Sequence, residues 1–146
     1  MNNNKLLDLR DYNDLYQREI AREISISRRT YSSWETSTRI IPLKHLNTLS
    51  NYYGVSMDYI MGLSKIKTNS KIRNIEMLSK IKIGKRIKQV RENNSLSLRE
   101  LARELNTTSS TISAYETGKT LILTAFAYQI CVKYKVSLDW LCGKVD

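Results

Sequence analysis

The sequence predicts an all-α fold in which one small helical unit is present twice in tandem. Residues 17–62 align without a gap on residues 98–143 at a constant offset of 81, and about a third of the aligned residues are identical. Within the aligned segments, apolar residues recur at helical spacing. Ser, Thr and Asn residues stand where helices are expected to begin or to turn. Because these signals recur in both copies, the two copies are expected to share one backbone.

The second copy shows its first two helices clearly. Ile87 and Val90 lie one helical turn apart among basic residues, which predicts a short amphipathic helix over residues 85–93. Ser97 is followed three residues later by Glu100, the pattern of a capping box at the start of a second helix. The inner face of this second helix is expected to consist of Leu98, Leu101, Ala102 and Leu105.

Three further helices are expected in the same copy. Asn106 tolerates the left-handed conformation of a tight interhelical turn, and Thr108 can cap a third helix that Gly118 ends. Ile112 and Tyr115 are expected to point inward from this helix. Residues 124–143 then supply a fourth helix and a short fifth one. Each copy is therefore expected to contain five helices.

The second and third helices of each copy are expected to form a helix-turn-helix. Ala21 and Ala102 occupy equivalent positions where the two helices cross, and a larger side chain there would push the helices apart. The first copy departs from the second in its turn residues. Tyr16 cannot cap as a serine does, so Asp14 is the expected cap, with Gln17 three residues on. Ser25 and Ser37 replace the Asn and Gly of the second copy.

The repeat divides the chain into residues 1–64, a basic linker of residues 65–82, and residues 83–146. Each copy has about 60 residues and can bury only about 60% of its unfolded surface, so it must be compact. The chain carries 24 basic and 14 acidic residues, a net charge of +10. Such an excess favours a polyanionic partner, and the alternative is a merely soluble basic surface.

Composition argues against several other classes of protein. No apolar run is long enough to span a membrane, and the polar start does not resemble a signal peptide, so a cytoplasmic protein without membrane contact is expected. Cys131 and Cys142 are expected to be packed thiols, with a regulatory thiol as the alternative. His45 is the only histidine and is expected at the surface or the rim of the core. We therefore expect no metal site, no cofactor, no small-molecule substrate and no enzymatic activity.

The combined motifs resemble the Cro/xenobiotic-response-element (XRE) family of helix-turn-helix DNA-binding domains. The shared features are EIA or ELA in the second helix, T-[IY]-S followed by a closing Glu in the third, and a VS-x-D-[YW] ending. The resemblance covers both copies, nearly all of the chain outside the linker. It implies two tandem lambda-repressor-like domains, double-stranded DNA as the partner, and a third helix that enters the major groove. Members are commonly bacterial or phage repressors.

The resemblance also implies which residues contact DNA in the first copy. They open the second helix and line the exposed start of the third. Arginine can pair with guanine, and glutamine with adenine. Two arginines at a helix N-terminus oppose the helix dipole, which favours a partner over a solvated helix start. The expected base-contacting set is Gln17, Arg28, Arg29, Ser32, Ser33 and Thr36, with Arg39 and Lys44 placed to meet phosphates.

The equivalent face of the second copy is short, polar and nearly neutral. Leu98 replaces Gln17, and serines replace both arginines. This copy could bind DNA weakly, contact a degenerate half-site, or serve as a pairing surface. Its candidate DNA contacts are Arg99, Ser109, Ser110, Ser113 and Lys119.

Equivalent aromatic and acidic residues are interpreted as structural. Trp34 and Tyr115 are expected in the core, and so are Tyr53 and Tyr134. Glu35 and Glu116, which end the third helices, are expected to hold the following loops.

The linker carries a helical pattern of its own. Apolar residues at every third position predict a helix over residues 70–80, and its polar side would carry Lys67, Lys71, Arg73, Lys80 and Lys82. This side is either a solvated face or a stripe that follows phosphates. A free linker of this length could span up to about 70 Å when extended, enough for both copies to bind adjacent grooves.

These features together predict a sequence-specific DNA-binding transcriptional regulator, and repression is its expected activity. The rival hypothesis is a protein-interaction adaptor, such as an antirepressor or an antitoxin-like protein, that uses the neutral third helix of the second copy. Self-association into a homodimer through the second copy stays open as a mixed case.

Overall fold

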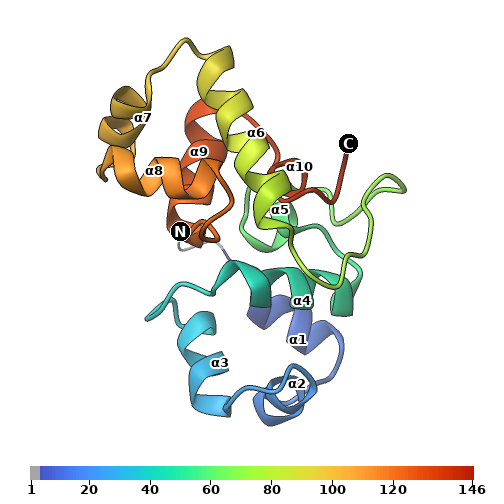
Figure 1. The fold of residues 1–146 in the computed structure, drawn as a ribbon. Coiled ribbons are helices and arrows are strands. Elements are labelled where there is room, and N and C mark those ends of the chain that lie inside the picture. The colour runs from blue at the N-terminus through green and yellow to red at the C-terminus, as the bar shows by residue number, and fades with distance from the viewer. Residues whose placement is uncertain (1–3) are drawn as a thin grey trace. The chain divides into compact units, whose positions relative to one another are not determined.

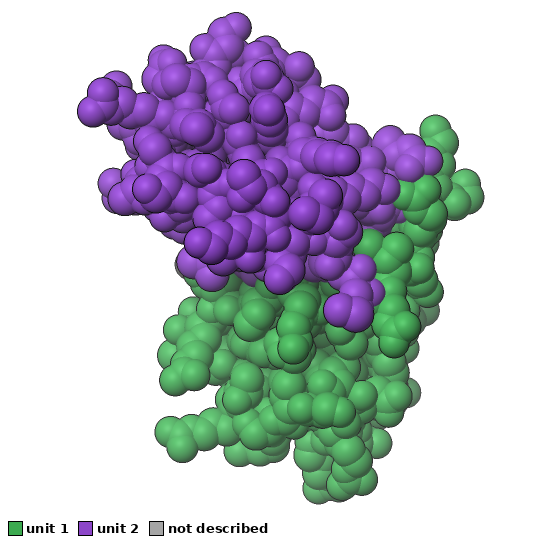
Figure 2. All heavy atoms as spheres, viewed as in Figure 1, with its two compact units in different colours: residues 1–76 green, residues 77–146 purple. Residues whose placement is uncertain are grey.

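The computed structural model describes residues 4–146, which form two compact units divided after Glu76 (Figure 2). Helices are the only regular secondary structure in this range, so the predicted all-α class is confirmed. Each unit contains five helices (Figure 1). Unit 1 has α1 (Leu6–Tyr12), α2 (Gln17–Glu23), α3 (Arg28–Glu35), α4 (Leu43–Tyr53) and α5 (Met57–Ile60). Unit 2 has α6 (Lys80–Asn93), α7 (Leu98–Glu104), α8 (Ser109–Glu116), α9 (Thr124–Tyr134) and α10 (Leu138–Leu141).

The two cores are built from equivalent positions. In each unit, every helix contributes a fully buried apolar or aromatic side chain at an equivalent position, and the offset of 81 residues holds for all five pairs. Ala21 and Ala102 are also buried, as their predicted place at the helix crossing requires. The pairs are Leu6 and Ile87, Ile20 and Leu101, Tyr31 and Ile112, Leu49 and Ile130, and Met57 and Leu138.

The helix starts of unit 2 follow the predicted caps. Ser97 Oγ accepts a 3.1 Å hydrogen bond from the Glu100 backbone N–H, and Glu100 Oε1 accepts one of 3.0 Å from the Ser97 N–H. The capping box is thus confirmed. Thr108 likewise caps α8 by accepting a hydrogen bond from the Thr111 N–H. Both caps satisfy backbone donors that have no partner within the helix.

The start of α2 differs from the prediction. Asp14 does not cap this helix, because it lies outside the helix in a left-handed turn with φ of 54°. Tyr16 is the residue before the first helical turn, and its N–H donates a 2.9 Å hydrogen bond to Glu19 Oε1. The acidic half of the capping box is therefore kept in unit 1 even though the serine half is absent.

Left-handed turns follow the second and third helices in both units. Asn106 and Gly118 adopt φ values of 57° and 76° in unit 2, and Ser25 and Ser37 adopt 59° and 60° in unit 1. Serine has a side chain that disfavours this conformation, whereas glycine does not. Unit 1 therefore holds the same backbone with less suitable residues.

The close approach of α6 to α8 depends on Gly84. A Cβ atom at this position would lie 2.5 Å from the backbone carbonyl oxygens of both Tyr115 and Glu116. Real Cβ atoms essentially never come so near a backbone atom, so only glycine fits here without separating the helices. This contact brings the first helix of unit 2 against the end of the third.

The helix predicted over residues 70–80 is not present. Residues 63–79 are non-helical, and α6 begins at Lys80, where Ser79 Oγ accepts a 3.1 Å hydrogen bond from the Lys82 N–H. The carbonyl of Ile75 accepts hydrogen bonds from two side chains of α4 instead of from a helical N–H. The prediction of a helix over residues 70–80 with basic residues along one side is therefore wrong. Only residues 80–82 of the expected linker are helical.

The aromatic residues predicted to lie in the core, and His45, are found inside the units or at the rim of their cores. Trp34 and Tyr115 are buried, while Tyr53 and Tyr134 are half-buried. Burial raises the pKa of Tyr53 to about 12, which keeps its hydroxyl neutral. His45 is half-buried at the rim, with its ring centroid 5.3 Å from that of Trp34.

The structure also locates the cysteines. Cys131 and Cys142 are both buried, as predicted, and neither is part of a disulfide. Over residues 4–146, the acidic, histidine and cysteine side chains form no group of three that could hold a metal ion. In the same range, every helix is too short or too polar to cross a lipid bilayer.

Candidate nucleic-acid interface

The α2 and α3 helices of unit 1 form a helix-turn-helix joined by residues 24–27. Gln17 is the first residue of α2, and Arg28 is the first residue of α3. A 3.2 Å hydrogen bond from Arg28 Nη1 to Gln17 Oε1 connects the two helix starts. Arg29 follows on α3 and is exposed. The structure thus brings together the predicted glutamine and the first of the two predicted arginines.

The carboxylate of Glu35, at the end of α3, is hydrogen-bonded to Gln17 of this pair and to Arg10 of α1. Glu35 accepts hydrogen bonds from Arg10 Nε at 2.8 Å and Arg10 Nη2 at 3.0 Å, and its side chain is only 5% exposed. The same carboxylate accepts a 3.1 Å hydrogen bond from Gln17 Nε2. Burial alone would raise the pKa of Glu35, but the hydrogen bonds from Arg10 and Gln17 hold it below its ordinary value. Glu35 is therefore ionised, and it orients Gln17 toward Arg28.

The equivalent ion pair in unit 2 is almost identical. Arg91 Nε and Nη2 donate to Glu116 at 2.7 and 3.0 Å, and this hydrogen bonding raises the pKa of Arg91. Arg91 Nη1 also donates to the carbonyl of Leu96, as Arg10 Nη1 does to that of Leu15. However, Leu98 stands where unit 1 has Gln17. The series of hydrogen bonds between side chains in unit 2 therefore ends at the carboxylate of Glu116.

The role predicted for Glu35 and Glu116 is corrected by these contacts. Both are structural, but each binds an arginine of the first helix in its unit and not the loop that follows it. Neither Arg10 nor Arg91 is among the residues singled out from the sequence. The signal was available, because the offset of 81 continues before Gln17 and relates Arg10 to Arg91.

The other residues predicted in unit 1 extend the same region of α3. Ser32, Ser33 and Thr36 lie three to eight residues after the two arginines, spacings that place them on one side of the helix. The Ser33 hydroxyl donates to the carbonyl of Thr30, and the Thr36 hydroxyl to that of Ser32. Their oxygens can still accept hydrogen bonds.

The two predicted phosphate contacts differ in their connection to α3. Arg39 is exposed, and its backbone N–H donates a 3.1 Å hydrogen bond to the carbonyl of Ser33, which holds the loop against α3. Lys44 is exposed in the first turn of α4. The structure thus ties Arg39 to the α3 region and places Lys44 on the next helix.

The predicted residues of unit 2 fall at the matching places. Ser109 is the first residue of α8, and Ser110 and Ser113 follow on the same helix. The backbone N–H of Lys119 donates to the carbonyl of Ala114, so the exposed lysine stays close to the end of α8. Arg99 is exposed in the first turn of α7. The α8 helix itself presents hydroxyl groups where α3 presents guanidinium groups.

Comparisons with known proteins match both units separately. One family model, described as "Helix-turn-helix", matches residues 6–60, and another, described as "Helix-turn-helix domain", matches residues 84–146. The chain is also 35% identical over 82 residues to the cryptic phage CTXphi transcriptional repressor RstR of Vibrio cholerae, over 53% of this chain and 74% of that protein. The chain belongs to the helix-turn-helix family of DNA-binding transcriptional regulators.

Two other known proteins are similar to this helix-turn-helix protein over a smaller part of its length. It is 35% identical over 60 residues to the uncharacterized HTH-type transcriptional regulator YobD of Bacillus subtilis (strain 168), covering 41% of this chain and 54% of that protein. The chain thus spans about half the length of that relative. The solved structure of the clp gene regulator ClgR from Corynebacterium glutamicum matches 46% of this chain and 71% of that one, with 21% identity and a TM-score of 0.41.

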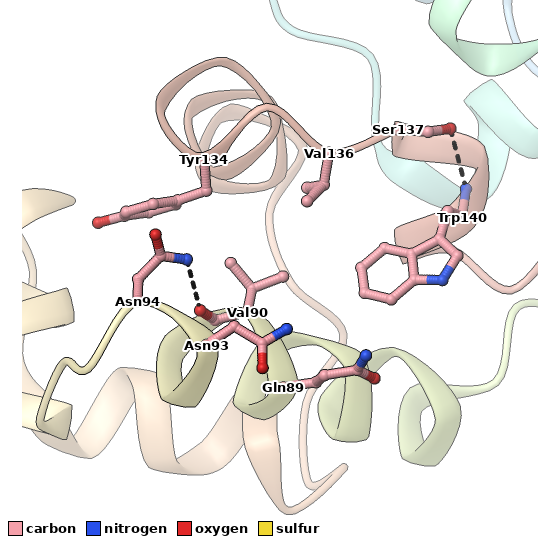
Figure 3. A pocket seen from close by; sticks show the side chains of 8 residues that line it. All are labelled: Gln89, Val90, Asn93, Asn94, Tyr134, Val136, Ser137 and Trp140. Atoms are coloured by element: carbon pink, nitrogen blue, oxygen red, sulfur yellow. Dashed lines mark hydrogen bonds between the residues drawn. The ribbon is translucent and has the colours of Figure 1, made fainter.

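The second helix-turn-helix unit also has two surface hollows. One, of about 450 Å³, borders α8 and is lined by Ser110, Thr111, Ala114, Tyr115, Thr120, Leu121 and Leu123. The other, of about 460 Å³, lies between α6 and the α9–α10 segment (Figure 3). Figure 3 shows that Asn94 and Ser137 beside it form hydrogen bonds at helix ends. Only the first hollow includes a residue predicted to contact DNA, Ser110.

Proposed function

We propose that this regulator is a repressor that binds a specific double-stranded DNA sequence and that unit 1 makes most of its base contacts. The observation that carries this proposal is the hydrogen bond between Arg28 and Gln17 at the meeting of the two helix starts. It holds a guanidinium group at the exposed N-terminal end of α3, where a helix-turn-helix contacts the major groove. Repression is the activity named for RstR, to which the chain is similar.

Arg28 and Arg29 are the proposed base-contacting residues. A guanidinium group can donate two hydrogen bonds to O6 and N7 of guanine, the commonest specific contact in the major groove. The position of both arginines carries an electrostatic cost in the fold, because a positive charge at a helix N-terminus opposes the helix dipole. Contact with the negatively charged duplex offsets this cost.

Gln17 has a different proposed role from the adenine contact expected from the sequence. Its Nε2 donates to Glu35, and its Oε1 accepts from Arg28. A bidentate pair with adenine needs both a donor and an acceptor of the same amide. Because Gln17 already uses one of each, we assign it to positioning Arg28.

The remaining predicted residues are proposed to hold the duplex. Ser32, Ser33 and Thr36 continue the α3 surface, and Arg39 and Lys44 are exposed cations suited to phosphates. In unit 2, Arg99 and Lys119 can bind phosphates. Ser109, Ser110 and Ser113 can accept or donate hydrogen bonds with little base selectivity. Unit 2 is therefore proposed to bind a less specific half-site.

A second candidate function for unit 2 is contact with protein. Its support is the hollow beside α8, whose lining includes Ala114, Tyr115, Leu121 and Leu123. An adaptor or a homodimer could bury these apolar side chains in place of a DNA contact. Analytical ultracentrifugation across a concentration series distinguishes a homodimer from a monomer.

The test begins with selection of bound duplexes from a random pool by the full chain. Binding of the preferred duplex is then compared between the wild type and the Arg28→Ser, Arg29→Ser double variant, which copies unit 2. Each lost base contact should cost about 1–3 kcal/mol and relax the preference at one base position. Binding should also weaken steeply as salt is added.

The matched control removes two charges elsewhere. Lys85→Ser, Lys88→Ser changes two exposed residues of α6 and should retain the base preference of the wild type. If both double variants lose affinity equally and keep the same preference, charge alone explains the binding and the assignment of Arg28 and Arg29 is wrong.

A further inference from the structure

The segment that follows α5 lies along unit 1 and is attached to it at two points. At the first point, the Ser56 N–H donates a 2.6 Å hydrogen bond to the carbonyl of Lys67. The Lys67 ammonium lies 4.8 Å from the ring centroid of Tyr12 and 6.0 Å from that of Tyr59. An ammonium group over aromatic rings at these distances is attracted by the negative ring faces.

The second attachment is a pair of asparagines on α4. Asn47 Nδ2 and Asn51 Nδ2 each donate a 2.8 Å hydrogen bond to the carbonyl oxygen of Ile75. Asn47 is only 1% exposed, although asparagine is a polar residue that is seldom buried without a partner. Its side-chain oxygen has no hydrogen-bond partner. The amide of Asn47 is thus committed to the linker at the cost of an unsatisfied oxygen.

The asparagine pair is not needed to build the fold itself. Tyr128 and Val132 occupy the equivalent positions of α9 in unit 2, which has the same five helices. A bare helix-turn-helix unit therefore forms without either asparagine. In unit 1 both asparagines donate a hydrogen bond to the carbonyl of Ile75. Their role is therefore to hold the linker.

Attachment at Ile75 shortens the free tether between the units. Helix α6 begins at Lys80, so only residues 76–79 lie between the attachment and the next helix. Five Cα-to-Cα steps can cover at most about 18 Å. A linker free from residue 63 to the same helix start has 17 such steps and could cover about 60 Å. The attachment therefore removes most of the reach that the sequence suggests.

We propose that Asn47 and Asn51 are positioning residues that restrict the spacing of the two DNA half-sites this regulator can bind at once. The inference rests on the proposed function, with unit 2 on the second half-site. Tethered units gain affinity only when the tether can span both sites. One helical turn of DNA adds about 34 Å to the separation while keeping both half-sites on one face. A tether of about 18 Å does not cover this added length.

The experiment uses the full chain and duplexes derived from its selected sequence. One duplex keeps the selected spacing, one has ten additional base pairs between the half-sites, and one has a single half-site. The wild type should bind the extended duplex about tenfold or more weakly than the selected one, and no better than the single half-site. The Asn47→Ala, Asn51→Ala variant should regain part of the lost affinity for the extended duplex.

Two insertions of the same ten-residue Gly-Ser segment make the test independent of core substitutions. Placed between Glu76 and Met77, the insertion lengthens the free tether and should restore binding to the extended duplex. Placed between Thr68 and Asn69, it lies between the two attachments and should have no such effect. In the double-alanine variant, the second insertion should become as effective as the first. Because Asn47 is buried, Asn51→Ala alone serves as a milder variant.

Three results would overturn the inference. They are equal wild-type affinity for both spacings, equal effects of the two insertions, and equal affinity for the single and double half-sites. Each of these leaves sequence-specific binding by unit 1 intact. Failure of the proposed function is distinct, because then no duplex is enriched from the random pool.

Discussion

Replacing Glu35 with glutamine should destabilise unit 1 strongly, because the glutamate completes a largely buried ion pair. The change keeps the size of the side chain but leaves the guanidinium group of Arg10 without its carboxylate. Breaking a buried ion pair costs about 3–5 kcal/mol. Arg10 retains its hydrogen bond to the carbonyl of Leu15, and its side chain is 15% exposed. We therefore expect a loss at or just below the lower end of this range, about 2–3 kcal/mol, which lowers Tm by about 10–20 °C for a domain of this size.

Tryptophan fluorescence can follow this unfolding in unit 1 alone. The chain contains two tryptophans, of which Trp34 lies in the core of unit 1 and Trp140 in unit 2. In a Trp140→Phe background, urea unfolding of Trp34 reports on unit 1. Glu23→Gln is the matched control, since Glu23 is exposed at the end of α2 and should change stability by less than about 0.5 kcal/mol.

The dependence on pH provides a second readout of the same ion pair. Because hydrogen bonds lower the pKa of Glu35 in the folded state, its stabilising contribution is present above the ordinary value of 4.5. It is lost as the pH falls through the lower folded-state pKa. Glu35→Gln should remove this part of the acid sensitivity. A variant with wild-type stability at pH 7 and an unchanged acid profile would refute the reasoning.

Two smaller predictions follow from differences between the equivalent positions of the units. Ser37→Gly should stabilise unit 1 by about 1 kcal/mol in urea unfolding, because glycine adopts the left-handed turn more readily. Gly118→Ser should destabilise unit 2 for the same reason. Changes in stability of the opposite sign would contradict this account. Burial lowers the pKa of His45 from its ordinary value of 6.5, so the unfolded chain binds a proton first and stability falls as the pH decreases below 6.5. His45→Phe, which copies Phe126, should flatten this dependence between pH 7 and pH 5, and an unchanged slope would show that another group is responsible.

The helices and the core could be predicted from the sequence because their signals are local and repeated. Ser97 and Glu100 lie within one helical turn of each other, so their capping box depends on nothing distant. The same holds for Asn106, whose left-handed turn follows directly from its position after a helix. Apolar spacing identified the buried residues for the same reason.

Local patterns failed where distant groups compete for the same backbone or side chain. Ile72, Ile75 and Leu78 have helical spacing, yet the side chains of Asn47 and Asn51 take the carbonyl of Ile75. No pattern within the linker reveals a competitor that comes earlier in the chain. Asp14 failed as a cap for a different reason, because α2 begins at Gln17 and Asp14 lies in a left-handed turn before Tyr16, the residue that precedes the helix.

The site was only partly visible from the sequence. Comparison of the copies pointed to Gln17, Arg28 and Arg29, because these positions diverge while the surrounding scaffold is kept. It did not show that the amide of Gln17 lies between Glu35 and Arg28. That arrangement joins residues from both ends of α3 and the start of α2, and side-chain geometry across helices is decided only by packing.

By itself, the sequence determined that one five-helix unit occurs twice and that its exposed third helix is basic in one copy and neutral in the other. These properties depend on short-range spacing and on residue chemistry, which are written directly in the chain. The tertiary structure alone decided which carboxylate holds which arginine and how much of the linker is free. Both depend on hydrogen bonds between residues at least 18 positions apart, such as Gln17 with Glu35 and Asn51 with Ile75, whose partners become neighbours only when the core has formed.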